Sequence, residues 1–404
     1  MTERQTVAVI GGGAAGLAAA IAAAECGDRV IVLERMDRVG KKLLATGNGR
    51  CNLMNTGDLR YHGDEAFAGH VLRLCSAKEQ SRFWRGLGLF LREEEAERVY
   101  PLTGQASTVL DTLRFTLEKL GIEVRTNTRV TKLSRSKGSW LVTTENGEFP
   151  CGRVIVAGGG KAQPKLGSDG STYALLESFG HRLVRPKPAL TQIETETAPI
   201  RGLTGIRIRA EAAVLRGDEC LRQERGELLF TDYGISGICA MQCAAYITPA
   251  AEISVNLLPG MSDENEIEND LRRRRNLWRE QPAERLFCGL LVPRLAERVA
   301  EAAGVKLKDR KAEALRDEEI RKLTRVLRDF RLRPTGIKGF ENAQVTAGGI
   351  GTEDFDPATM ESRLAPGLHA AGEVLNVDGD CGGYNLMFAF GSGILAGLNG
   401  RKRP

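Results

Sequence analysis

The chain has 404 residues, too many for one ordinary hydrophobic core, and this length predicts two or three domains. Hydrophobic residues make up 42% and charged residues 27%, which excludes a disordered chain and is typical of a soluble globular protein. No apolar run reaches the roughly 18 residues of a membrane span, and residues 1–5 do not resemble a signal peptide. The nine cysteines lack metal or disulfide spacing, so we expect reduced thiols, no metal and a cytoplasmic location.

The net charge of +5 is spread along the chain, and its one dense basic run is the four arginines at 272–275. Acidic residues such as Asp263 and Glu268 precede this run in a helical pattern, which predicts a solvated helix face. Few aromatic residues accompany the arginines, which argues against a base-stacking surface. We therefore expect a small-molecule substrate rather than a nucleic acid, and the oligomeric state stays open.

The first pattern with chemical content is an apolar strand, 7–10, that leads directly into glycines and an alanine-rich helix. Gly11, Gly13 and Gly16 fit the G-x-G-x-x-G spacing of dinucleotide-binding turns. The first glycine makes the turn, the second admits a pyrophosphate, and the third lets helix and strand pack closely. The residues expected at the pyrophosphate are Gly11, Gly13, Ala14, Ala15 and Gly16.

A second predicted strand, 29–33, ends at Glu34, an acidic residue at the distance expected for a ribose contact. The following stretch, 35–55, is rich in Gly, Asn, Lys and Arg without periodicity, and it predicts an ordered loop around a large cofactor. Lys42 and Arg50 in this loop can face phosphate. Cys51 lacks a C-x-x-C partner and is interpreted as a packing residue.

The middle of the chain alternates between helical and strand patterns. Residues 68–120 are helical in pattern with an interruption at 93–102, interpreted as an exposed segment and a loop. A strand at 153–156 then ends in Gly158, Gly159 and Gly160, and we expect it to return to the nucleotide sheet and meet the cofactor. Short strands follow between 186 and 259, including 219–223 and 227–230, and residues 262–330 return to charged helices.

The C-terminal part predicts a helix at 384–398 whose small residues permit tight packing. Gly382 and Gly383 free the helix N-terminus to approach a ligand. A helix N-terminus stabilises negative charge, and reduced flavin carries such charge, so this helix suits a flavin.

Several segments together resemble the BaiN-like family of FAD-dependent oxidoreductases, also called YhiN-type or aminoacetone-oxidase-family flavoproteins. The matching segments are the glycine turn, 40–53 (GKKLLATGNGRCNL), 231–237 (TDYGISG), 346–349 (TAGG), 359–362 (TMES) and 366–385. The resemblance covers essentially the whole chain. It implies an α/β fold with a Rossmann-type, glutathione-reductase-like FAD-binding domain at 1–188 and 338–404. It further implies an inserted β-barrel-like domain at 189–260 and 331–337, and a small helical domain at 261–330.

The resemblance implies FAD as the cofactor, with a hydride passing through flavin N5 from NADH or NADPH to an organic acceptor such as an activated C=C bond. No second G-x-G-x-x-G is present, so two alternatives stay open: the nicotinamide binds transiently over the flavin, or it is not the electron donor. Beyond the pyrophosphate residues, the expected cofactor contacts are Glu34, Arg35, Lys42, Gly49, Arg50, Cys51, Asn52, Val130, Ala157, Gly158, Gly159, Gly372, Glu373, Gly383, Asn385 and Leu386.

Two alternatives stay open: a flavin amine oxidase that uses oxygen, and a non-enzymatic flavin sensor or RNA-associated flavoprotein. No catalytic side chain is assigned, because none of the four histidines lies in a recognisable catalytic pattern.

Overall fold

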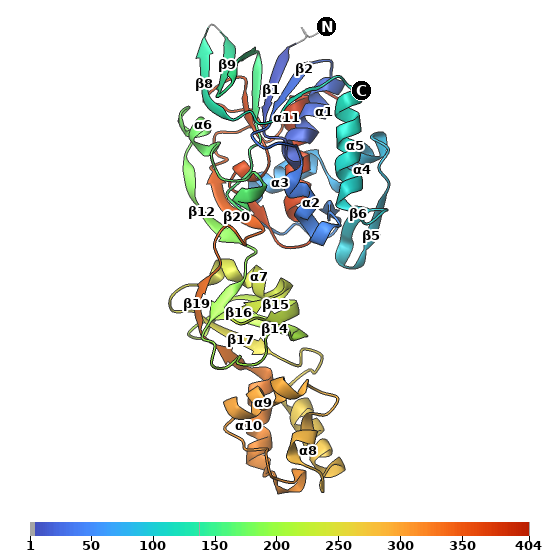
Figure 1. The fold of residues 1–404 in the computed structure, drawn as a ribbon, viewed down its shortest axis with the longest axis vertical. Coiled ribbons are helices and arrows are strands. Elements are labelled where there is room, and N and C mark those ends of the chain that lie inside the picture. The colour runs from blue at the N-terminus through green and yellow to red at the C-terminus, as the bar shows by residue number, and fades with distance from the viewer. Residues whose placement is uncertain (1–4, 137, 404) are drawn as a thin grey trace. The chain divides into compact units, whose positions relative to one another are not determined.

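The structure, a computed structural model, describes residues 5–136 and 138–403. These divide into two compact units, one formed by residues up to Pro188 together with residues from Ala343 onward, and the other by Ala189–Asn342 (Figure 1). Both ends of the chain therefore build the first unit, and the second is an insertion. The predicted three-domain boundaries stay a prediction.

A parallel five-stranded sheet forms the centre of the first unit, with the order β21-β11-β1-β2-β7. Its strands are β1 (Thr6–Ile10), β2 (Arg29–Leu33), β7 (Glu123–Arg125), β11 (Arg153–Val156) and β21 (Leu368–Ala370). β1 and β11 are fully apolar except for Thr6 and Arg153, as expected for strands covered on both faces. The predicted return of residues 153–156 to the side of the first strand is confirmed.

Smaller elements complete this unit. An antiparallel sheet contains β8 (Val130–Ser136), β9 (Ser139–Thr144) and β10 (Gly147–Cys151). The helices are α3 (Glu65–Leu74), α4 (Ala77–Gly86), α5 (Ala106–Lys119) and α6 (Tyr173–Glu177), and two strand pairs join β12 (Leu183–Ala189) to β20 (Val345–Ile350) and β4 (Tyr61–Gly63) to β22 (Val377–Gly379).

Two predictions for this unit were wrong. The expected loop at 35–55 contains the helix α2 (Lys41–Ala45), a 3₁₀ turn (Thr46–Gly49) and the strand β3 (Met54–Asn55). The interruption at 93–102 is largely exposed up to residue 97, as predicted, but it forms the hairpin of β5 (Leu91–Glu94) and β6 (Arg98–Pro101), which joins β3 in a small sheet. Both segments are too short for periodicity to reveal them, and their formation depends on burial of residues such as Leu43 and Val99.

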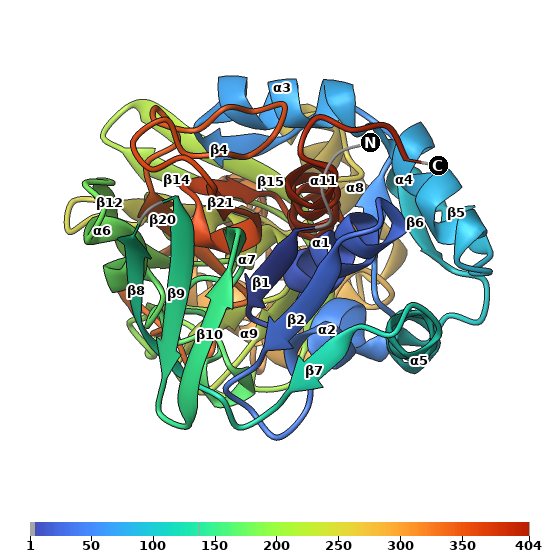
Figure 2. The same cartoon turned by 90° about the horizontal axis from the view of Figure 1, so that it is seen from above.

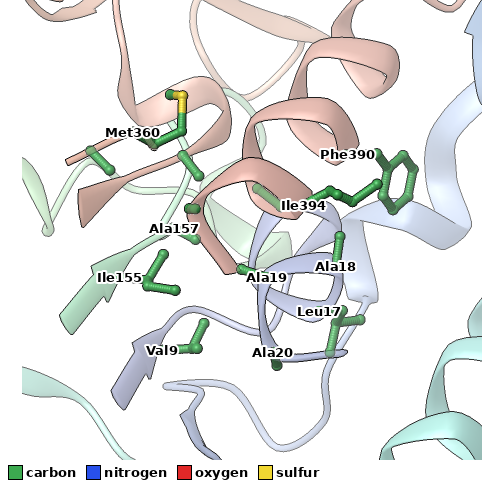
Figure 3. Packing of buried hydrophobic residues seen from close by; sticks show 14 of the residues in the cluster. Val9, Leu17, Ala18, Ala19, Ala20, Ile155, Ala157, Met360, Phe390 and Ile394 are labelled. Atoms are coloured by element: carbon green, nitrogen blue, oxygen red, sulfur yellow. The ribbon is translucent and has the colours of Figure 1, made fainter. Parts of the chain in front are cut away.

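The helices α1 (Ala14–Glu25) and α11 (Tyr384–Leu398) lie side by side against the sheet (Figure 2). A Cβ atom at Gly393 would lie under 3.0 Å from the carbonyl oxygen of Ala15, and one at Gly397 would lie as close to that of Ala19. The two backbones thus touch where only glycine fits. Around this contact, Ala18, Ala19, Phe390 and Ile394 belong to the same buried hydrophobic cluster as Val9 and Ile155 of the sheet (Figure 3).

The second unit contains a seven-stranded sheet and several helices. The sheet order is β18-β17-β14-β15-β16-β13-β19, with β13 (Ile193–Thr195), β14 (Arg207–Arg216), β15 (Glu219–Phe230), β16 (Gly234–Ser236), β17 (Glu252–Asn256), β18 (Phe330–Leu332) and β19 (Pro334–Ile337). The segments 219–223 and 227–230, predicted as separate strands, form the single strand β15. The main helices are α7 (Ile238–Cys243), α8 (Glu264–Leu277), α9 (Pro293–Ala302) and α10 (Asp317–Arg328).

The arginine run lies on α8, and each of its four guanidinium groups has a carboxylate partner. Arg272 and Arg275 pair with Asp317 at the start of α10, and Arg273 and Arg274 pair with Asp270 on the same helix. These pairs fit the predicted solvated helix face. Within the described part of the chain, no helix has the length and apolarity that a membrane crossing requires.

The close approach of α1 and α11 generates a stability prediction. Gly393→Ala should lower the free energy of unfolding by about 2 kcal/mol, because the added methyl group forces two packed backbones apart. Gly69→Ala is the matched control, since Gly69 lies within α3 and nothing lies within 4 Å of its added Cβ. This control should raise stability by about 0.5–1 kcal/mol through helix propensity. Urea denaturation followed by tryptophan fluorescence measures both, and equal effects of the two substitutions would contradict this packing.

Candidate cofactor and active site

The turn between β1 and α1 requires its glycines. Gly11 has a φ of +103°, and a Cβ on it would collide with the carbonyl of Ala157. A Cβ on Gly16 would collide with the carbonyl oxygen of Gly11, whereas a Cβ on Gly13 would meet nothing within 4 Å. No side chain caps the N-terminus of α1. The turn therefore leaves the first amide groups of α1, at Ala14, Ala15 and Gly16, without a side-chain acceptor beside open space, which is how a helix N-terminus receives an anion.

Glu34 is held beside this turn. Its Oε2 accepts from the Gly12 amide at 2.7 Å, and its Oε1 accepts from the Met36 amide at 2.7 Å. An ionised carboxylate offers about four acceptor positions, so two stay available after these bonds. The backbone carbonyl of Glu34 also accepts from Thr128, two residues before the buried Val130 that begins β8. The structure thus brings the predicted ribose residue and the predicted adenine neighbour to the same end of the sheet.

The turn after β11 lies next to the first turn. A Cβ at Gly158 would collide with the side chain of Thr172, and one at Gly159 would collide with Ser168 Oγ. The segment that contains Ser168 and Thr172 is therefore packed directly on the two glycines. Ala157 is buried and contacts the Gly11 turn, so this part of the site is closely packed.

The three basic residues predicted along the cofactor all have acidic partners. Arg35 pairs with Asp169. Lys42 Nζ lies 2.9 Å from Glu373 Oε2, and Arg50 lies 2.6 Å from Glu94. Arg50 also stacks over the ring of Tyr100, at 4.1 Å, so its guanidinium is directed toward β5 and β6. Their positive charges are thus largely compensated within the protein.

Four buried polar atoms around these turns have no hydrogen-bond partner among the described residues: Arg35 Nε, Asn52 Oδ1, Thr172 Oγ1 and the Tyr173 hydroxyl. Burial raises the pKa of Tyr173, and the nearby Glu373 carboxylate raises it further, so the phenol keeps its proton as a donor. Other orphaned atoms are scattered through both units, but these four adjoin the residues predicted to hold the nucleotide. Orphaned buried donors and acceptors cost free energy unless a ligand satisfies them, so these residues fit a polar, extended cofactor such as FAD.

The N-terminus of α11 forms the other end of the candidate site. Gly383 has a φ of +105°, and a Cβ on it would lie under 3.0 Å from the carbonyl of Met54 and from Asn52 Oδ1. Asn385 closes the preceding turn, because its side chain accepts from the Gly379 amide at 2.8 Å and donates to the Gly379 carbonyl at 2.7 Å. The segment 46–55 and the start of α11 are therefore joined, although more than 300 residues separate them.

The remaining residues predicted to contact the cofactor differ in their contacts and in their burial. Glu373 Oε1 accepts from the Thr346 amide at 3.0 Å, and a Cβ on Gly372 would lie under 3.0 Å from Ala15 Cβ, which places this turn beside the start of α1. Gly49 borders open space, and Leu386 is half-buried. Cys51 is fully buried, and this burial raises the pKa of its thiol to about 12, so it stays protonated and inert.

Residues that the sequence did not reveal are Thr172, Tyr173 and Asp169, together with the group of His62, Asp378 and Asp380 near the N-terminus of α11. The pattern Asp378-Gly379-Asp380 directly before the glycines of α11 was the available signal for the second group. The first group carried no recognisable pattern.

The sheet, the glycine turn and the acidic residue after β2 define a Rossmann-type nucleotide-binding protein. A family model described as the HI0933-like protein Rossmann domain matches residues 5–399, and the chain belongs to this family. The predicted fold class is thereby confirmed.

Two curated relatives match over nearly their whole lengths. The 3-dehydro-bile acid delta(4,6)-reductase of Clostridium scindens is 38% identical over 409 residues, which is 98% of this chain and 99% of that protein. The ribosomal RNA dihydrouridine synthase of Escherichia coli is 28% identical over 400 residues, 96% of each chain. The predicted family resemblance is confirmed, and the chain is a flavoprotein oxidoreductase.

Among solved structures, an open conformation of a flavocytochrome c3 fumarate reductase matches 99% of this chain and 78% of that one, with 20% identity and a TM-score of 0.48. This overlap is too loose to carry any function across.

The position of Glu34 generates a binding prediction. Glu34→Gln should weaken FAD binding about tenfold, because an amide group cannot accept from both backbone amides and a ribose hydroxyl as the carboxylate can. The measurement is FAD fluorescence during titration of the apo-protein. Glu123→Gln on the neighbouring strand β7, where the half-buried carboxylate pairs with Arg125, should leave the affinity unchanged. Equal affinity of the Glu34 variant and the native chain would remove the ribose assignment.

Proposed function

We propose that the chain binds FAD along the Gly11 turn, with the flavin ring near the N-terminus of α11, and reduces a C=C bond conjugated to a carbonyl group. The observation that carries this proposal is the cluster of orphaned polar atoms at Arg35, Asn52, Thr172 and Tyr173, in a chain 38% identical to a reductase. FAD, when bound, supplies a hydride at N5.

The side chains and backbone of the protein do the binding and the charge stabilisation. The uncapped amides of α1 receive the pyrophosphate, and Glu34 accepts from the ribose. The uncapped N-terminus of α11 stabilises the negative charge of the reduced flavin ring. Since Arg35, Lys42 and Arg50 already have carboxylate partners, the backbone amides carry the anion binding.

The substrate class follows from the chemistry that the names of both relatives share. A delta(4,6) bond system in a 3-dehydro bile acid is conjugated to the C3 ketone, and a uracil ring that becomes dihydrouracil loses a C=C bond conjugated to its C4 carbonyl. The carbonyl group makes one alkene carbon electrophilic, which is what a hydride requires. We therefore assign an activated alkene as the substrate, with a small molecule favoured by the higher identity to the bile-acid enzyme.

An RNA substrate is the second candidate, favoured by the 28% identity to the ribosomal RNA enzyme. The arginines of α8 do not support it, since all four pair with carboxylates. As electron donor we propose NADH or NADPH, bound transiently, and we infer a cytoplasmic location.

The test is anaerobic mixing of the FAD-loaded protein with NADH or NADPH, followed by a 3-oxo-4,6-diene bile acid. Flavin absorbance should bleach with one nicotinamide and return when the alkene is added, because the reducing equivalents pass to the double bond. Return of colour with a uridine-containing ribosomal RNA fragment, but not with the bile acid, would select the second candidate. Bleaching by an amine with no response to either nicotinamide would contradict the reductase and favour an oxidase.

A further inference from the structure

His62 lies in a group of carboxylates beside the start of α11. It is the middle residue of β4, and the antiparallel pairing of β4 with β22 sets it opposite Asp378. His62 Nε2 lies 2.8 Å from Asp380 Oδ1, a hydrogen bond between residues 318 positions apart in the sequence. Asp380 is almost fully buried, whereas about a third of the His62 side chain is exposed. This imidazole thus has one nitrogen fixed by a buried carboxylate and part of its ring open to solvent.

Asp378 is the second carboxylate that faces His62. It is almost fully buried, and the strand pairing sets it opposite His62. Burial, against the opposing effect of His62 and together with the neighbouring Glu373 and Asp380 carboxylates, raises its pKa to about 6. Burial of a carboxylate is costly, and a nearby imidazolium reduces that cost.

The position of β4 relative to α11 is fixed by direct contacts. The Tyr61 hydroxyl donates to the backbone carbonyl of Tyr384 at 2.8 Å, and the two rings meet edge to face at 5.8 Å. Asn385 bonds to Gly379 and to the Asp380 carbonyl. The His62–Asp380 pair is therefore held rigidly against the first turn of α11, the element to which the proposed function assigns the flavin ring.

The other three histidines are excluded by their surroundings. His181 is buried against Ser362 and stacked on Phe355. His369 is buried within β21, an edge strand of the parallel sheet, with Asn399 as its partner, and burial lowers its pKa to about 4. His70 is exposed on α3. His62 alone among the four combines a buried carboxylate partner with solvent access.

We propose that His62, oriented by Asp380, is the acid that protonates the substrate during alkene reduction. This inference rests on the proposed function. The hydride that reduced FAD supplies forms a C–H bond at the alkene carbon β to the carbonyl, and the C=C π pair moves toward the α carbon. His62 gives its proton to that α carbon, so the alkene gains one hydride and one proton, and the imidazole is left neutral. Solvent then returns a proton to the exposed ring.

The charges around His62 favour its protonated form. Asp378 and Asp380 contribute two carboxylates directly, and Glu373 stands behind Asp378 while paired with Lys42. The chain segments that flank β4 add Arg60 before the strand and Asp64 and Glu65 after it, and β20, which also packs on β4, contains no titratable side chain. Acidic groups outnumber basic ones, which stabilises an imidazolium.

The first experiment isolates the step that consumes the alkene. FAD-loaded protein is reduced with dithionite, which avoids any dependence on the nicotinamide, and is mixed anaerobically with the 3-oxo-4,6-diene bile acid. His62→Gln should slow flavin reoxidation about 100-fold, the lower range of general-acid effects, while FAD affinity and reduction by the nicotinamide stay unchanged. His70→Gln is the matched control and should react as the native chain does. Native reoxidation rates in His62→Gln would overturn the proposal.

A second measurement separates this proposal from the proposed function. The imidazole signals of selectively ¹⁵N-labelled histidines, assigned by the two variants, should show His62 protonated to a higher pH than His70. Asp380→Asn should move the His62 titration to lower pH, because it removes the charge that favours the imidazolium. If the native chain reduces neither the bile acid nor the RNA fragment, the proposed function fails. The titration still shows independently whether Asp380 keeps the His62 imidazole protonated. A His62 that titrates at or below His70, unaffected by Asp380→Asn, would overturn its role as an acid.

Discussion

The contact between the backbones of α1 and α11 is the constraint on which the first unit depends. Gly393 and Gly397 meet Ala15 and Ala19 in the same order, so the two helices run parallel. α11 begins well before the point that faces Ala15, and at 1.5 Å per residue its N-terminus extends about 12 Å past that of α1. The N-termini of α1 and α11, which carry partial positive charge, thereby lie at a fixed offset. The first suits a pyrophosphate, and the second suits a flavin ring that gains negative charge.

Charge compensation is the second organising feature. A Rossmann-type site with several lysines and arginines invites an interpretation in which cations bind the phosphates. Here Arg35, Lys42 and Arg50 each have a carboxylate partner, and these pairs connect distant segments. Glu34 likewise accepts from two backbone amides. The acidic and basic side chains thus fix the frame of the site, and the open backbone amides of the glycine turn are left for the ligand.

The contrast between the glycine turns and the side-chain pairs also explains which features the sequence could predict and which it could not. β1, α1, β2 and α11 follow from the glycine spacing, the apolar strands and the small-residue pattern, which are local signals. The helix α2 and the β5–β6 hairpin are short and depend on burial against other elements, so no local pattern identifies them. The partners within the site are equally non-local: Asp169 lies 134 residues from Arg35, and Asp380 lies 318 residues from His62. Glycine positions could therefore be predicted, whereas the side-chain pairs required coordinates.

The central claim is that one FAD molecule lies between both ends of the chain. Hydrogen–deuterium exchange of the apo and FAD-loaded protein tests it most directly, because it reports on amides along the whole backbone. FAD should slow exchange at residues 11–16 and at residues 382–386 together, with the same concentration dependence, while exchange in α8 stays unchanged. Protection at only one of these two segments, or at neither, would contradict it.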